Sequence, residues 1–135
     1  VQAQILNLLK YLQDTSDLSM LFISHDLSVV RHMCDRVMVL YLGKVMEFGE
    51  RDRLLSTPRH PYTQALIAAA PVPDPEIEKT RRAIPLKGEV PSPVNPPSGC
   101  VFRTRCPKAA DRCATDVPEL RALGPGHNVA CHFPD

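Results

Sequence analysis

Apolar positions recur at helical spacing near the start of the chain. One face carries Ile5, Leu8, Leu9 and Leu12, and the opposite face carries Gln4, Asn7, Lys10 and Gln13. Because residues three and four apart lie on the same side of an α-helix, this pattern predicts an amphipathic helix over about residues 2 to 13. We expect the apolar face of this helix to pack on a sheet.

The next apolar segment has no helical spacing. Residues 20–23 are continuously apolar, which is typical of a strand covered on both faces of a parallel sheet. The run ends at Ser24-His25-Asp26, and a short helix follows, marked by Leu27, Val30 and Met33. Ligands of parallel α/β sheets collect where a strand ends and a helix begins, and there the free backbone N–H groups attract anions. His25 is therefore a candidate to contact a phosphate.

A β-hairpin is expected after this helix. Residues 36–42 form the first strand, Gly43-Lys44 the turn, and residues 45–48 the antiparallel partner. All 14 prolines follow residue 57. Proline lacks a backbone donor and breaks helices, so residues 71–97, which contain eight prolines, are predicted to be an extended connector. A helix from about Pro61 to Pro71 is the exception, with an apolar face of Tyr62, Ala65, Leu66 and Ala69.

Composition narrows the class of protein only slightly. A chain of 135 residues with 44% hydrophobic residues and a net charge of +1 can bury one modest core, and its charge indicates no particular partner. No apolar stretch has transmembrane length and no secretion leader is evident, so we expect a cytosolic or cytosol-facing protein. Since Val1 runs into a helix without a capping residue, we expect the sequence to be part of a longer polypeptide.

Four segments resemble one known family. Phe22-Ile23-Ser24-His25-Asp26-Leu27 is similar to the switch-histidine segment of ABC-type ATPases, and residues 36–43 to the strand that follows it. Residues 58–66 (PRHPYTQAL) and 88–100 resemble the C-terminal extension of the ATPase subunits of oligopeptide and dipeptide importers. The resemblance implies an α/β fold, with the C-terminal part of an ABC nucleotide-binding domain at 1–56 and a proline-rich, cysteine-containing extension of little regular structure at 57–135.

This resemblance also implies a function. In the family the histidine corresponding to His25 contacts the γ-phosphate of ATP, bound with Mg²⁺, and helps to align water with the catalytic glutamate. The sequence contains no phosphate loop, signature segment or Walker B strand, so we expect no ATP hydrolysis by this segment alone. The implied partners are a second ATPase subunit, membrane permease subunits and, indirectly, a periplasmic peptide-binding protein, with no nucleic acid. The implied location is the cytoplasmic face of the bacterial inner membrane, and the transported solute could also be nickel or another small solute.

The proline-rich region contains four cysteines: Cys100, Cys106, Cys113 and Cys131. Disulfides, zinc and an iron–sulfur cluster are the three interpretations. Disulfides suit secreted proteins, to which nothing in the sequence points. Four thiolates satisfy either Zn²⁺ or a [4Fe–4S] cluster, and intervals of 5, 6 and 17 residues favour loops around a bulkier cluster over the close pairs of structural zinc sites. The family resemblance also implies [4Fe–4S], with zinc as the alternative.

Nearby residues bear on these interpretations. Arg103, Arg105, Lys108 and Arg112 outnumber Asp111, and such a positive surplus should lower thiol pKa values. His127 and His132 flank Cys131 and could replace a thiolate on zinc. His60 is interpreted as a capping or packing residue without chemistry, and Cys34 as an isolated residue near the core. A rival hypothesis is that the tail is a non-catalytic, metal-binding interaction or regulatory module.

Overall fold

The computed structural model describes residues 1–135, and the chain divides into two compact units. Unit 1 comprises Val1–Asp35 and unit 2 comprises Arg36–Asp135. None of the helices has both the length and the apolar character required to span a bilayer. The domain limits of 1–56 and 57–135 stay a prediction.

Unit 1 contains two helices, α1 (Gln2–Ser16) and α2 (Leu27–Met33). The helix predicted from the apolar spacing is thus confirmed as α1, and it runs three residues further, to a left-handed C-cap at Asp17. The short helix predicted from Leu27 is confirmed as α2, which begins where the Asp26 carboxylate accepts a hydrogen bond from the Ser28 N–H.

The strand predicted at residues 20–23 is not present. This segment has no regular secondary structure, and the side chains of Leu21 and Ile23 are 91% and 94% exposed. A strand needs a neighbouring strand for its backbone donors and acceptors, and unit 1 contains only helices. For the same reason the apolar face of α1 has no sheet to cover within this unit, and Ile5 and Leu8 stay more than half exposed.

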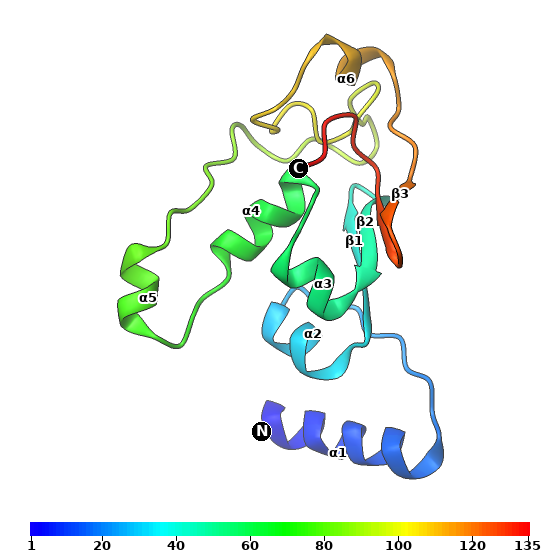
Figure 1. Ribbon diagram of the computed structural model, residues 1–135, viewed down its shortest axis with the longest axis vertical. Helices are drawn as coiled ribbons and strands as arrows, with labels where there is room; N and C mark the ends of the chain where they lie inside the picture. Colours follow the sequence, from blue (N-terminus) through cyan, green and yellow to red (C-terminus); the bar gives the residue numbers. More distant parts are fainter. The chain divides into compact units, whose positions relative to one another are not determined.

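Unit 2 is built on a four-stranded antiparallel sheet with the order β1-β2-β4-β3 (Figure 1). The strands are β1 (Arg36–Tyr41), β2 (Lys44–Glu50), β3 (Arg121–Gly124) and β4 (His127–Val129). The predicted hairpin is confirmed as β1–β2, although its turn is Leu42-Gly43, one residue earlier than expected. Both turn residues have positive φ, 47° and 74°, which matches the right-handed twist of the flanking strands.

Four helices complete unit 2. They are α3 (Arg51–Ser56), α4 (Pro61–Ala69), α5 (Pro75–Thr80) and α6 (Asp111–Thr115). The helix predicted from Pro61 is confirmed as α4. The proline-rich tail has more regular structure than predicted, because α5, α6, β3 and β4 all lie within it.

The core of unit 2 joins the tail to the hairpin. Phe102, from the tail, is completely buried, and its ring centroid lies 5.2 Å from those of both Tyr41 and Tyr62. Leu54 of α3 and Val129 of β4 are also buried. The proline-rich tail therefore shares one apolar core with the β1–β2 hairpin and α3.

Candidate functional site

His25 lies in the coil just before α2, and its side chain is exposed. The backbone around it is held by two local hydrogen bonds. Ser24 Oγ accepts from the Asp26 N–H at 3.0 Å, and Asp26 Oδ1 accepts from the Ser28 N–H at 2.8 Å. These bonds fix the start of α2 and leave the imidazole in contact with solvent. The residue is thus at the start of a helix, as predicted, but not at the end of a strand.

The four tail cysteines come from separate segments of unit 2. Cys100 and Cys113 are buried, Cys106 and Cys131 are half-buried, and all four are free thiols. Two of these segments are joined directly, because the Cys100 N–H donates to the Cys113 carbonyl at 2.8 Å. Gly99 permits this contact, since its φ is +64° and a Cβ there would lie 2.3 Å from the Cys113 carbonyl oxygen.

Burial dominates the protonation of the thiols of Cys100, Cys106 and Cys131. It raises the pKa of Cys100 and of Cys106, and it raises that of Cys131 to about 11. The charges of other cysteines raise these pKa values further. Arg103 and Lys108 act in the opposite direction without offsetting burial. The local positive charges thus lower the thiol pKa values as predicted, but burial outweighs them at Cys100 and Cys106.

No three histidine, cysteine or carboxylate side chains are arranged to hold a metal ion. The metal centre predicted from the four cysteines is thus not formed by the side chains in this structure. Both candidate histidines have other partners, because His127 Nε2 bonds to Glu47 and His132 Nε2 bonds to the Asp116 carbonyl. The sulfur atoms themselves suit a thiolate-bound metal, because backbone N–H groups already donate to two of them. Lys108 N–H donates to Cys106 Sγ and Phe133 N–H to Cys131 Sγ, each at 3.4 Å.

His60 acts as a cap, as predicted from its place before Pro61. Its Nδ1 accepts a hydrogen bond from the Tyr62 N–H at 3.0 Å, at the N-terminus of α4. The side chain is 1% exposed, and burial lowers its pKa from 6.5 to about 4 against the opposing charge of Glu47. The ring is therefore neutral at pH 7 and packs against Phe102, with centroids 5.8 Å apart.

Glu47 is the polar residue that sequence reasoning missed. This carboxylate is fully buried on β2 and accepts hydrogen bonds from two backbone N–H groups and one histidine. A signal for it exists in the sequence, because Glu47 interrupts the otherwise apolar run Val45-Met46-Glu47-Phe48. The partners were not predictable in the same way, since His127 lies 80 residues away.

With this geometry in place, similarity to known proteins identifies the class. Residues 46–113, half of the chain, match the family described as oligopeptide/dipeptide transporter, C-terminal region. The chain belongs to this family. It is 60% identical over 131 residues to a putative peptide import ATP-binding protein of Brucella ovis, which covers 97% of this chain and 41% of that protein.

Two relatives from Bacillus subtilis also align with nearly the whole chain. The chain is 58% identical over 133 residues to the putative oligopeptide transport ATP-binding protein YkfD. It is 54% identical over 133 residues to the oligopeptide transport ATP-binding protein AppF. Each alignment covers 98% of this chain and 40% of the relative, so the chain spans about two fifths of the length of these proteins.

Proposed function

We propose that this chain is part of the ATP-binding subunit of an ABC importer for dipeptides or oligopeptides. The observation that carries the proposal is the 54–60% identity to peptide and oligopeptide transport ATP-binding proteins over nearly the whole chain. The intact subunit would bind ATP with Mg²⁺ and hydrolyse it to drive transport. Nickel or another small solute is the alternative cargo.

In that subunit His25 is the proposed switch histidine. Its motif has the family's order, and its exposed imidazole precedes α2, free to approach a γ-phosphate supplied by other parts of the protein. Phosphoryl transfer depends chiefly on positioning and on stabilising charge as it develops. An imidazole that orients water and contacts the γ-phosphate contributes to both. The residues described here contain no phosphate loop, so catalysis is proposed for the intact subunit only.

The test is His25→Ala in the full-length subunit. ATP affinity should change by about twofold or less, while turnover should fall by about 10²-fold or more, as for the loss of a positioned catalytic group. His32→Ala is the matched control, because His32 is also an exposed histidine, at the far end of α2, and should leave turnover unchanged. Equal loss of binding and turnover, or no loss of either, would contradict the role of His25.

The four tail cysteines are the proposed ligands of a [4Fe–4S] cluster, with zinc as the alternative metal. Support comes from the donor set: four free thiols that influence one another electrostatically, two of them already accepting backbone N–H bonds. A bound metal would supply the positive charge that keeps such buried sulfurs deprotonated. In this proposal the bound metal stabilises the fold of the tail. The rival proposal is that the tail is an interaction module that regulates the ATPase.

Anaerobic purification followed by assays of iron, sulfide and zinc tests the metal. A brown protein with about four irons and four sulfides per chain would support the cluster. Zinc without iron would support the alternative, and the absence of both would refute metal binding by the tail. The same chain with Cys34→Ser should keep its metal, because Cys34 is outside the group.

Partners and location follow from the same proposal. The intact subunit would pair with a second, identical or homologous ATPase subunit and bind the membrane permeases on the cytoplasmic face of the inner membrane. It would contact the periplasmic binding protein only indirectly and would bind no nucleic acid. Co-purification of the full-length subunit with the permeases from detergent-solubilised membranes tests this assembly.

A further inference from the structure

Glu47 is a carboxylate without solvent contact in the middle of the sheet of unit 2. The Glu47 side chain is 0% exposed. Within the sheet, Glu47 is paired with Val39 of β1 on one side and with Val129 of β4 on the other. A buried carboxylate is strongly destabilising unless hydrogen-bond donors surround it. The donors around Glu47 therefore indicate what this residue holds together.

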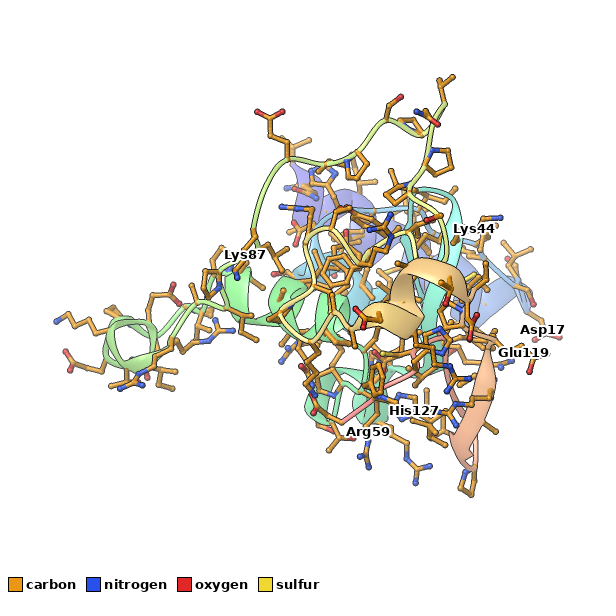
Figure 2. All side chains as sticks on the ribbon, turned by 90° about the horizontal axis from the view of Figure 1, so that it is seen from above. Asp17, Lys44, Arg59, Lys87, Glu119 and His127 are labelled. Carbon is orange, nitrogen blue, oxygen red and sulfur yellow. The ribbon has the colours of Figure 1, made fainter.

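Three hydrogen-bonding groups from two segments meet this single side chain. Oε1 accepts from the Arg59 N–H at 2.8 Å and lies 2.5 Å from His127 Nε2, and Oε2 accepts from the His60 N–H at 3.0 Å. Because a carboxylate only accepts, the imidazole carries its proton on Nε2. Arg59 and His127 lie side by side in Figure 2, on the two segments that Glu47 joins to β2.

The strand fastened by this contact leads directly to Cys131. β4 has only three residues, and three paired residues give little stability on their own. The Ala130 N–H extends the pairing by donating to the Met46 carbonyl at 2.9 Å, and Cys131 follows. Cys100 and Cys113, by contrast, are held to each other by their own backbone hydrogen bond, and that bond does not involve β4.

We infer that Glu47, through His127, is the positioning residue that holds β4, and with it Cys131, against β2. Loss of the carboxylate removes the side-chain link to β4 and leaves a buried backbone donor without a partner. The short strand then separates more often from β2 and exposes Cys131, while Cys100 and Cys113 keep the backbone hydrogen bond that joins them. The metal-related part of this inference rests on the proposed function of the tail, whereas the positioning part does not.

Glu47→Gln is the test variant, because glutamine keeps the shape but replaces one accepting oxygen with a donating amide. Native alkylation with N-ethylmaleimide, followed by peptide mass spectrometry, gives a rate for each cysteine. We expect the rate at Cys131 to rise about tenfold or more, as expected for the loss of a charged hydrogen bond, and that at Cys100 to change by less than about twofold. Glu50→Gln is the matched control, since Glu50 is exposed at the end of the same strand, and should change neither rate.

Two outcomes would overturn the inference: an equal rise at all four cysteines, or no rise at Cys131. If Glu47→Gln does not fold, His127→Asn replaces it, because the shorter side chain of asparagine does not carry its amide to the place of the histidine Nε2, and it should give the same selectivity for Cys131. Rescue by the conservative His127→Gln, whose amide can still donate to the carboxylate, should restore part of the protection. An absence of selectivity in the folded His127→Asn protein would equally refute the positioning role.

Anaerobic titration with Co²⁺ separates this inference from the proposed metal site. Thiolate-to-cobalt absorbance increases with the number of sulfur ligands, so wild type should give the signal of four thiolates and Glu47→Gln that of three. If wild type binds no cobalt, the metal proposal fails and the alkylation pattern still decides the positioning role. If both proteins give the four-thiolate signal, Glu47 does not position Cys131.

Discussion

His60 should make the stability of unit 2 depend on pH in a defined window. Burial lowers the pKa of this ring from 6.5 to about 4, against the smaller opposing effects of the Glu47 charge and of a backbone hydrogen bond with Ala130. Between pH 6.5 and 4 the unfolded chain therefore binds a proton that the folded chain does not. The contribution of neutral His60 to the free energy of unfolding is fully present above pH 6.5. It is lost as the pH falls towards 4, and the total loss is about 3 kcal/mol.

Urea unfolding at several pH values between 7 and 4, followed by circular dichroism, measures this loss. The comparison is with His60→Asn, because asparagine can still accept from the Tyr62 N–H as a helix cap but does not titrate. The variant should be less stable at pH 7, yet its stability should fall with acid by about 3 kcal/mol less than that of wild type. Parallel pH profiles for the two proteins, or an NMR titration of His60 with a midpoint near 6.5, would refute the reasoning.

Two further predictions concern packing and backbone conformation, and both are checked by urea unfolding. Phe102→Ala should reduce the free energy of unfolding by about 3–5 kcal/mol, whereas Phe102→Leu should cost far less; similar losses would mean that the ring is not the centre of the core. Gly43→Ala should cost only about 1–2 kcal/mol, because φ is positive but the space around it is open. Gly99→Ala should cost clearly more, because the new Cβ also meets the Cys113 carbonyl; equal costs would contradict this contact.

Elements with strong local signals were predictable from sequence. The apolar spacing of α1, the hairpin of β1 and β2, and the proline at the start of α4 depend on residues close in the chain. The helix α5 had such a signal as well, since Asp74 accepts a hydrogen bond from the Glu76 N–H just after Pro75. Its six residues lie within a proline-rich segment, and composition concealed that signal.

Elements that depend on distant partners were not predictable. Strands β3 and β4 have four and three residues, too few for an alternating pattern, and exist because β2 offers an edge. The opposite error occurred at residues 20–23, where apolar character predicted a strand but no neighbouring strand is present in unit 1.

In the candidate site, too, roles that depend on neighbouring residues were predictable and roles that depend on distant residues were not. The capping role of His60 could be predicted because Pro61 and Tyr62 are adjacent to it in sequence. The role of Glu47 could not, because a buried carboxylate is explained only by the donors around it, and one of them lies at residue 127. The protonation of the cysteines was misjudged because charge can be counted in a sequence and burial cannot.

The pairing of β2 with β4 also constrains when unit 2 can fold during synthesis. The β1–β2 hairpin can form as soon as residue 50 leaves the ribosome, but Glu47 stays hydrated until the strand 80 residues later has emerged. Closing so long a loop costs entropy before any contact repays it, which makes the final step slow relative to the hairpin. A nascent chain therefore exposes the inner face of its sheet until β4 has emerged, and it is in this interval that a chaperone would find apolar surface to bind.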